Sequence, residues 1–153
     1  MTMKYWLLKS DLEDYPLSRF IKDKITPWEG VRNYQARNYM TQAMTVGDQG
    51  IFYHSNATPS EAVAVLEIAS APKPDKLARD KKSDYYDPKA TDENPIWQCV
   101  DVKFIKAFKK PVTLDAMRKD PALEAMVLLK RGNRLSITPL SETEFLKICE
   151  LAQ

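Results

Sequence analysis

The chain contains a single histidine, His54, so any histidine-based acid–base or nucleophilic mechanism must use it. His54 lies near the end of a predicted strand over residues 50–55, where a side chain can face a ligand. Ser55 follows directly, but neighbouring strand residues point to opposite faces, so the two are not expected to form a nucleophile–base pair. No G-x-S-x-G or H-E-x-x-H motif surrounds them. His54 is therefore interpreted as a structural or ligand-orienting imidazole, and an acid–base role is the alternative.

Carboxylates, glycines and cysteines give no recognisable catalytic or metal-binding pattern. Asp11 and Glu13 follow the first predicted strand and are interpreted as residues at the entry to a helix. The chain has 4 glycines, and none has the spacing of a phosphate-binding or dinucleotide-binding loop. Cys99 and Cys149 are far apart and neither belongs to a C-x-x-C pair, which argues against a zinc site or a disulfide framework. We therefore expect no cofactor and no metal, and we favour a non-catalytic protein over an enzyme that uses His54.

Aromatic, amide and guanidinium side chains gather in residues 27–38, with the sequence Pro-Trp-Glu-Gly-Val-Arg-Asn-Tyr-Gln-Ala-Arg-Asn. A planar nucleobase needs faces to stack on, and donors and acceptors for its edge. Trp28 and Tyr34 offer faces, Asn33 offers edge contacts, and Arg32 offers phosphate contacts or stacking. The start of the following helix adds partial positive charge. The alternative is that these aromatic residues lie in the core and the arginines on the surface.

The elements that must position these residues form a mixed pattern. The sequence predicts strands over residues 5–8, 50–55, 62–68, 97–108 and 135–137, and helices after Pro16, over about 32–44, after Thr113 and after Ser141. The last helix has the clearest signal, because Ser141 and Glu144 form a capping box. Prolines break the periodicity of residues 71–96. This order predicts a single α+β domain over residues 1–153, with a curved, barrel-like, mostly antiparallel sheet surrounded by short helices.

Composition and charge narrow the class of protein. Hydrophobic residues make up 44% and charged residues 29% of the 153 residues, which is typical of a globular domain. The net charge is only +2, a weak value for a protein that grips many phosphates. Local clusters of Lys and Arg occur at residues 73–82, 103–110 and 130–134, and taken alone each is better explained as a solvated surface than as a nucleic-acid contact. No apolar run approaches the roughly 20 residues of a membrane span, and no secretory signal is present, so we expect a cytoplasmic protein with no membrane contact.

Several segments resemble, in the correct order, the motifs of the EVE domain family. They are residues 4–10 (Lys-Tyr-Trp-Leu-Leu-Lys-Ser), 28–38, 46–48 (Val-Gly-Asp), 52–55 (Phe-Tyr-His-Ser), 85–88 (Tyr-Tyr-Asp-Pro), Trp97 with 100–102 (Val-Asp-Val), and 134–136 (Arg-Leu-Ser). The resemblance covers nearly the whole chain and implies a PUA-like fold, similar to YTH and ASCH domains. It also implies a cleft that reads a modified base, as the related YTH domain holds a methylated adenine in an aromatic cage.

The resemblance also implies a set of ligand-binding residues. Trp28 resembles a wall of the cage, Asn33 and Tyr34 would contact the base, and Arg134 would line the mouth of the pocket. The complete set is Lys9, Ser10, Trp28, Val31, Arg32, Asn33, Tyr34, His54, Ser55, Tyr85, Arg134, Leu135 and Ser136. The resulting hypothesis is a monomeric module that binds a modified base in DNA or RNA and acts alone or through a separate effector protein.

Overall fold

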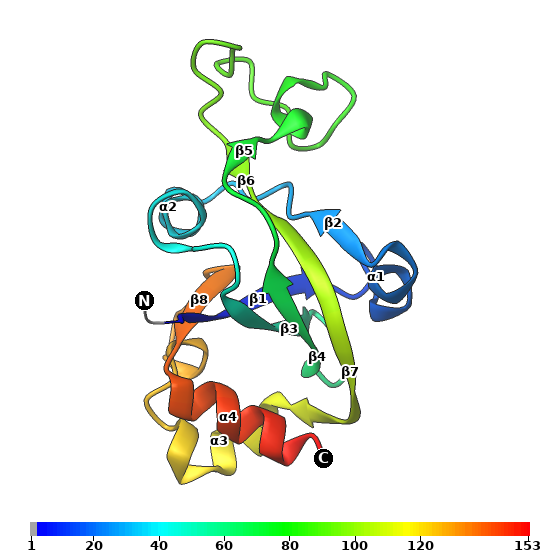
Figure 1. The fold of residues 1–153 in the computed structure, drawn as a ribbon, viewed down its shortest axis with the longest axis vertical. Coiled ribbons are helices and arrows are strands. Elements are labelled where there is room, and N and C mark those ends of the chain that lie inside the picture. The colour runs from blue at the N-terminus through cyan, green and yellow to red at the C-terminus, as the bar shows by residue number, and fades with distance from the viewer. Residues whose placement is uncertain (1–2) are drawn as a thin grey trace.

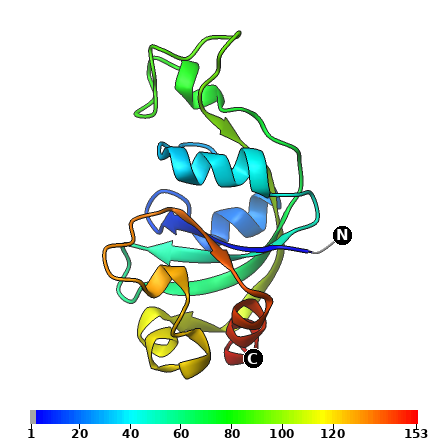
Figure 2. The same cartoon turned by 90° about the vertical axis from the view of Figure 1, so that its left-hand side faces the viewer.

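The computed structural model describes residues 3–153, and its centre is a curved six-stranded sheet (Figures 1 and 2). The strand order is β2-β7-β4-β3-β1-β8. The strands are β1 (Tyr5–Asp11), β2 (Ile25–Pro27), β3 (Gln49–Ser55), β4 (Glu61–Ile68), β7 (Asp101–Thr113) and β8 (Ile137–Leu140). Strands β1 and β3 run parallel, and the other neighbouring pairs are antiparallel. The expected α+β architecture with a mostly antiparallel, barrel-like sheet is thereby confirmed.

Short helices surround the sheet, and two of them, α3 and α4, start with the caps that the sequence predicts. The helices are α1 (Leu17–Asp23), α2 (Tyr34–Asn38), α3 (Leu114–Lys119) and α4 (Glu142–Leu151), and α2 continues into a π-helical turn (Tyr39–Ala43). The Thr113 hydroxyl accepts a hydrogen bond from the backbone N–H of Ala116 and starts α3. Both bonds of the Ser141–Glu144 capping box are present at α4. These caps satisfy backbone N–H groups that have no partner inside the helix.

The sheet is buried on both faces, which explains the continuous apolar run at the start of the chain. On β1, the side chains of Trp6 and Leu8 pack in one core with Phe20 of α1 and Met40 of the π-helical turn. Leu7 points to the opposite face, into a second core. That second core contains residues from α3 and α4, which lie together at one end of the molecule (Figures 1 and 2). The sequence of a strand that is buried on both faces is a continuous apolar run rather than an alternation of apolar and polar residues.

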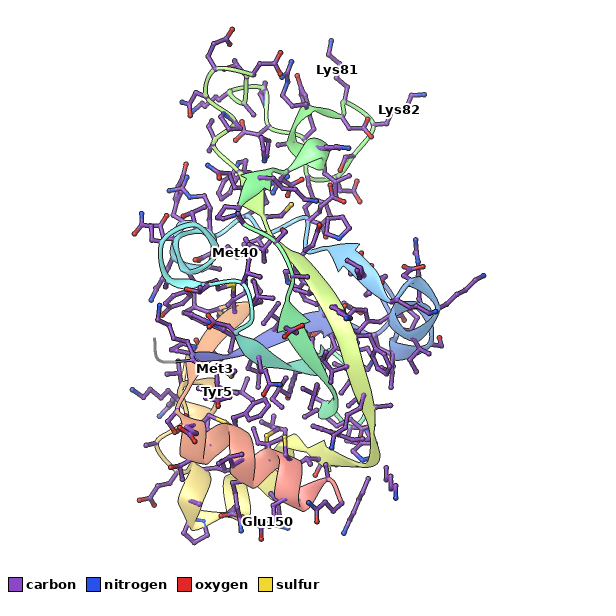
Figure 3. All side chains as sticks on the ribbon, in the orientation of Figure 1. Met3, Tyr5, Met40, Lys81, Lys82 and Glu150 are labelled. Carbon is purple, nitrogen blue, oxygen red and sulfur yellow. The ribbon has the colours of Figure 1, made fainter. Side chains whose placement is uncertain are left out.

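An arm of residues 71–97 projects from the end of the molecule opposite α3 and α4 (Figure 1). The short strands β5 (Lys73–Pro74) and β6 (Gln98–Cys99) pair at its base, and a 3-10 turn (Lys76–Arg79) follows β5. A small core of its own contains Ala78, Ala90 and Trp97. Figure 3 shows Lys81 and Lys82 extending outward from this arm. The irregular structure expected for residues 71–96 is confirmed.

The strands differ from the prediction in several places: β1 extends beyond residue 8 to Asp11, and the short edge strand β2 was not expected. The expected strand over residues 97–108 is divided at Val100, and its second part, β7, continues to Thr113. The Val100 carbonyl accepts from the Trp28 N–H (2.8 Å) and the Ser70 hydroxyl accepts from the Asp101 N–H (2.8 Å), so the chain changes partners here. The strand expected over residues 135–137 begins only at Ile137, because the preceding segment turns at Gly132, which has a φ of 78°. The division at Val100 therefore depends on contacts distant in sequence.

Candidate functional site

A cavity of about 540 Å³ opens where the end of β1, the loop after β2 and the arm meet. We call it the aromatic cavity, because Tyr15, Trp28 and Tyr85 line it. The predicted ligand-binding residues that line it are Lys9, Ser10, Trp28, Val31, Arg32, Asn33, Tyr85, Arg134 and Ser136. These residues come from segments far apart in sequence, so the fold brings most of the predicted set together.

Tyr34, His54, Ser55 and Leu135 lie outside the lining of the aromatic cavity. Tyr34 is the first residue of α2; its ring is 60% exposed and stacks on Trp97 with centroids 4.9 Å apart and planes at 19°. Ser55 faces a different cavity, on the other side of β1. The separation of Ser55 from His54 follows from the alternation of side chains along β3, as the sequence analysis expected.

Trp28 belongs to the main core and also lines the aromatic cavity. Its backbone N–H extends the pairing of β2 with β7, and its side chain is only 8% exposed. The indole meets the ring of Phe52 edge-on, with centroids 5.8 Å apart and planes at 85°. Trp28 therefore lines the cavity from a position anchored in the main core.

The buried carboxylate of Asp75 fixes the arm to the loop over residues 28–33. It accepts hydrogen bonds from the Gly30 N–H (2.8 Å), from Arg32 Nη1 (3.0 Å) and from the Leu77 N–H (2.8 Å). The Asp75 side chain has no exposed surface. A buried charge of this kind is stable only when it is paired and hydrogen-bonded. Asp75 thus acts as the junction that sets the distance between the two walls of the cavity.

Arg32 directs its donors to the protein rather than into the cavity. Its Nε and Nη2 donate to the Tyr85 carbonyl (3.0 and 2.8 Å), and Nη1 donates to the Val31 carbonyl (2.9 Å) as well as to Asp75. The guanidinium also lies 5.2 Å from the centroid of the Trp97 ring. These contacts test neither of the two roles expected for Arg32, a phosphate contact or stacking on a base; within the protein, Arg32 holds the Tyr85 carbonyl.

Tyr85 packs directly across the backbone of Gly30. Gly30 has a φ of 88°, and a Cβ built at this position would lie 3.1 Å from the Tyr85 ring. A glycine is therefore required here both for the left-handed backbone and for the close approach of the ring. Tyr85 is 40% exposed, so part of its surface is available to a ligand.

Tyr15 is an aromatic wall that the sequence analysis did not identify. Its hydroxyl donates to Asp23 Oδ2 (2.9 Å), and its ring contacts Phe52 and Phe20 with centroids 6.3 and 6.0 Å apart. Burial, together with the nearby carboxylate of Asp23, raises the pKa of Tyr15 to about 12. The only local signal was an aromatic residue between the first predicted strand and Pro16, and nothing in the sequence shows that it turns toward Trp28.

Burial shifts two ionisable groups of the aromatic cavity, Lys9 and Glu29, toward their neutral forms. Burial lowers the pKa of the Lys9 ammonium group. Burial, with a smaller contribution from Asp75, raises the pKa of Glu29. The Asn33 Oδ1 already accepts from the Ala36 N–H (3.0 Å), so Nδ2 is the atom that it can offer to a ligand. A cavity with such groups suits an uncharged ring whose edge carries hydrogen-bond donors and acceptors.

His54 is a structural residue in this fold. Its Nε2 accepts a hydrogen bond from the Leu17 N–H at the start of α1 (3.1 Å), and its side chain packs edge-on against Phe52 with centroids 4.9 Å apart. The residue is only 5% exposed. A nitrogen that accepts from a backbone N–H is not available to remove a proton from a substrate. The ligand-orienting or structural interpretation of His54 is therefore the one that the geometry supports.

We expect the free energy of unfolding to fall when the pH drops below about 6.5, the ordinary pKa of histidine. Burial lowers the pKa of folded His54, so the unfolded chain binds the proton first and the stability present at higher pH is lost as the pH falls. Denaturant unfolding of the natural protein and of a His54→Gln variant across this range tests this. The difference in stability between the two proteins should shrink toward acid pH, and parallel profiles would contradict the assignment.

Within residues 3–153, no group of three or more His, Cys, Asp or Glu side chains is placed to hold a metal ion. No helix in the same range is long and apolar enough to cross a membrane. Cys99 is buried in β6 and Cys149 is half-buried on α4, and the two are not joined.

Known proteins include several that are similar to this chain in sequence and in structure. The family model described as "EVE domain" matches residues 4–151. Thymocyte nuclear protein 1 of Gallus gallus is 36% identical over 168 residues, which cover 95% of this chain and 67% of that protein. The crystal structure of human THYN1 protein in complex with DNA containing 5-methylcytosine has a TM-score of 0.90 and 32% identity, and covers 98% of each chain.

A more distant likeness concerns the fold alone. The YTH domain of the Zygosaccharomyces rouxii MRB1 protein, solved in complex with N6-methyladenosine RNA, matches with a TM-score of 0.56 at 15% identity. The alignment covers 99% of this chain and 87% of that domain. The curved sheet described above is thus the PUA-like fold that EVE and YTH domains share.

Proposed function

The chain belongs to the EVE domain family, and from this premise we propose that it is a non-catalytic module that holds one modified nucleobase of a nucleic acid in the aromatic cavity. The observation that carries this proposal is the convergence of Tyr15, Trp28 and Tyr85 around one cavity. Aromatic faces give stacking energy to any planar base, and polar edges give selectivity.

The edge of the base would meet polar groups contributed by several segments. Ser10 uses its hydroxyl hydrogen in a bond to the Tyr15 carbonyl (3.2 Å), which leaves its oxygen as an acceptor for a donor on the ligand. Asn33 offers Nδ2, and Ser136 offers a hydroxyl from the segment before β8. This combination reads hydrogen-bond patterns on an extruded base, as base-flipping proteins do.

The preferred ligand in this proposal is DNA that contains 5-methylcytosine. The human THYN1 protein, 32% identical to this chain, was crystallised with such DNA, and the coverage of both chains is nearly complete. RNA with a methylated base is the second ligand to test, because the more distant YTH domain was solved with methylated RNA.

Catalysis through His54 was the alternative hypothesis, and no contact in the aromatic cavity favours it. The imidazole does not line the cavity, and its Nε2 is occupied by the Leu17 N–H. We therefore propose a monomeric reader whose downstream effect depends on a separate effector protein. A cytoplasmic location stays a prediction for this chain, since the animal relatives carry the word nuclear in their name.

The test is a titration of the protein with short DNA and RNA oligonucleotides, single- and double-stranded, with and without methylated cytosine or adenine. We expect a preference for one modified base and a log–log dependence of affinity on salt with a slope shallower than about −5, since one cavity dominates binding. The weak net charge of +2 is the basis for that slope. Equal affinity across the panel would contradict the reader function, and a steeper slope would contradict the single-cavity description.

A further inference from the structure

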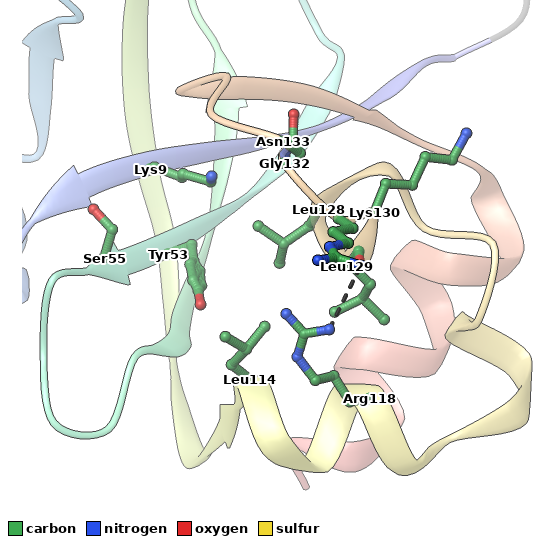
Figure 4. Close-up of a pocket in the computed structure, with 11 residues that line it drawn as sticks. Lys9, Tyr53, Ser55, Leu114, Arg118, Leu128, Leu129, Lys130, Gly132 and Asn133 are labelled. Carbon is green, nitrogen blue, oxygen red and sulfur yellow. Dashed lines mark hydrogen bonds between the residues drawn. The ribbon is translucent and has the colours of Figure 1, made fainter.

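A second cavity, of about 530 Å³, lies between β1, β3, α3 and the loop over residues 128–133 (Figure 4). We call it the basic cavity, because Lys9, Arg118, Lys130 and Arg131 line it and no carboxylate belongs to its lining within the described residues 3–153. Leu114, Leu128 and Leu129 give the cavity an apolar part of its lining. The aromatic cavity, in contrast, contains both cations and carboxylates.

The cations of the basic cavity lack acidic partners. Among residues 3–153, none of the ion pairs includes Lys9, Arg118, Lys130 or Arg131. Figure 4 shows the side chains of Lys9 and Arg118 extending into the same space from β1 and from α3, whereas Lys130 extends away from it. Arg118 donates to the Leu129 carbonyl at 3.4 Å, a long bond that uses one of the five N–H donors of a guanidinium. The remaining donors are available to an anion.

Asn133 and Tyr53 add two more donors to the wall, and that of Asn133 has no acceptor within the described residues. Asn133 Oδ1 accepts from the Leu135 N–H (3.4 Å), which leaves Nδ2 as a buried donor without a partner within the described residues. An unsatisfied buried donor is costly, and a ligand oxygen would remove that cost. Burial also raises the pKa of the Tyr53 phenol, so this group remains a protonated donor. The wall thus offers donors from a guanidinium, an ammonium group, an amide and a phenol, a set that matches the several oxygens of a phosphate.

The two cavities are neighbours separated by one short segment. Lys9 lines both of them, Asn133 lines the basic cavity, and Arg134 and Ser136 line the aromatic cavity. The Lys9 N–H donates to the Ser136 carbonyl (2.8 Å), which fixes the segment 133–136 to β1. A strand lying across this segment would place a base on one side and a phosphate on the other.

We propose that the basic cavity binds a backbone phosphate of the nucleic-acid strand whose modified base occupies the aromatic cavity, an inference that rests on the proposed function. Phosphate contacts position a protein on nucleic acid and carry no sequence information themselves. The basic cavity would therefore set the register of the strand, so that the modified base enters the aromatic cavity. The phosphate bound there contributes to the affinity for an oligonucleotide, whereas a free nucleoside has no phosphate and gains nothing from this cavity.

The experiment compares Arg118→Gln with Lys109→Gln, a matched control that removes the same charge from the exposed part of β7. Each protein is titrated with an oligonucleotide that carries the preferred modified base and with the corresponding free nucleoside. Arg118→Gln is expected to weaken oligonucleotide binding about tenfold and to reduce the salt slope by about 0.7–0.9. Nucleoside affinity should not change in either variant. Equal effects of the two substitutions on oligonucleotide binding would overturn the proposal.

A second measurement does not require recognition of a modified base. Inorganic phosphate is titrated into the natural protein and into Arg118→Gln while NMR follows the amide signals of Gly132 and Asn133. Saturable shifts that are lost in the variant support the phosphate site, and shifts that persist in the variant overturn it. Phosphate binding that depends on Arg118, without binding of any oligonucleotide, would reject the backbone phosphate and identify a free phosphorylated molecule as the occupant. Failure of every modified base to bind, with phosphate binding intact, would reject the proposed function separately.

Discussion

Replacing Asp75 by alanine is expected to lower the free energy of unfolding by about 3 kcal/mol, because the change leaves a partly buried guanidinium and two backbone N–H groups without their acceptor. Asp75 accepts from Gly30, Arg32 and Leu77, and its side chain is completely buried. Loss of the carboxylate also releases Arg32, which holds the Tyr85 carbonyl. The same variant should therefore bind the modified base more weakly, although Asp75 does not line the cavity.

The measurement is denaturant unfolding of Asp75→Ala, Asp75→Asn and Asp92→Ala. Asp92 lies on the same arm and pairs with Arg79, but its side chain is 88% exposed, so its loss should change stability much less. Asp75→Asn keeps the shape and an acceptor oxygen but removes the charge, and should fall between the other two. Similar unfolding energies for Asp75→Ala and Asp92→Ala would show that the carboxylate of Asp75 does not join the arm to the loop.

Local patterns identified the elements whose determinants are close in sequence. The capping box at Ser141 and Glu144 marked the start of α4, and Thr113 marked the start of α3. The alternation of His54 and Ser55 along β3 correctly separated the two side chains. In each case the deciding interaction spans a few residues, so the sequence alone contains it.

Features that depend on distant contacts could not be predicted in the same way. Asp75 lies 45 positions from Gly30 in the sequence, and no local pattern pairs them. Tyr15 precedes α1 and Trp28 follows β2, yet both line the same cavity, and no local pattern shows that they meet. Tyr34 has the chemistry of a base-stacking residue, but the direction of α2 places its ring on Trp97 instead. The sequence thus indicated the chemistry of the site, and the three-dimensional structure decided which side chains share a cavity.

Replacing Trp28 by alanine is expected to weaken binding of the modified base by about 1–3 kcal/mol, because the base loses one stacking face. From the sequence alone, the variant is expected to retain a cooperative fold. The structure shows that the variant should also be less stable than the natural protein. Trp28 is 8% exposed and packs on Phe52, so its removal leaves a cavity in the main core and should lower stability by about 3 kcal/mol. Binding must therefore be measured under conditions where denaturant unfolding shows the variant to be folded.

The Tyr85→Ala variant removes an aromatic ring from the aromatic cavity without removing a side chain from the main core. Tyr85 lines the aromatic cavity but is 40% exposed, so its truncation should weaken binding of the modified base with a smaller effect on stability than that of Trp28→Ala. Tyr86→Ala is the matched control, because this neighbouring ring is similarly exposed and lies outside the lining of the cavity. Weaker binding in Tyr85→Ala and Trp28→Ala, with natural affinity in Tyr86→Ala, would place the base between these two rings. If all three variants bind the modified base as the natural protein does, the base occupies some other surface, and the stability loss in Trp28→Ala reports only on the core.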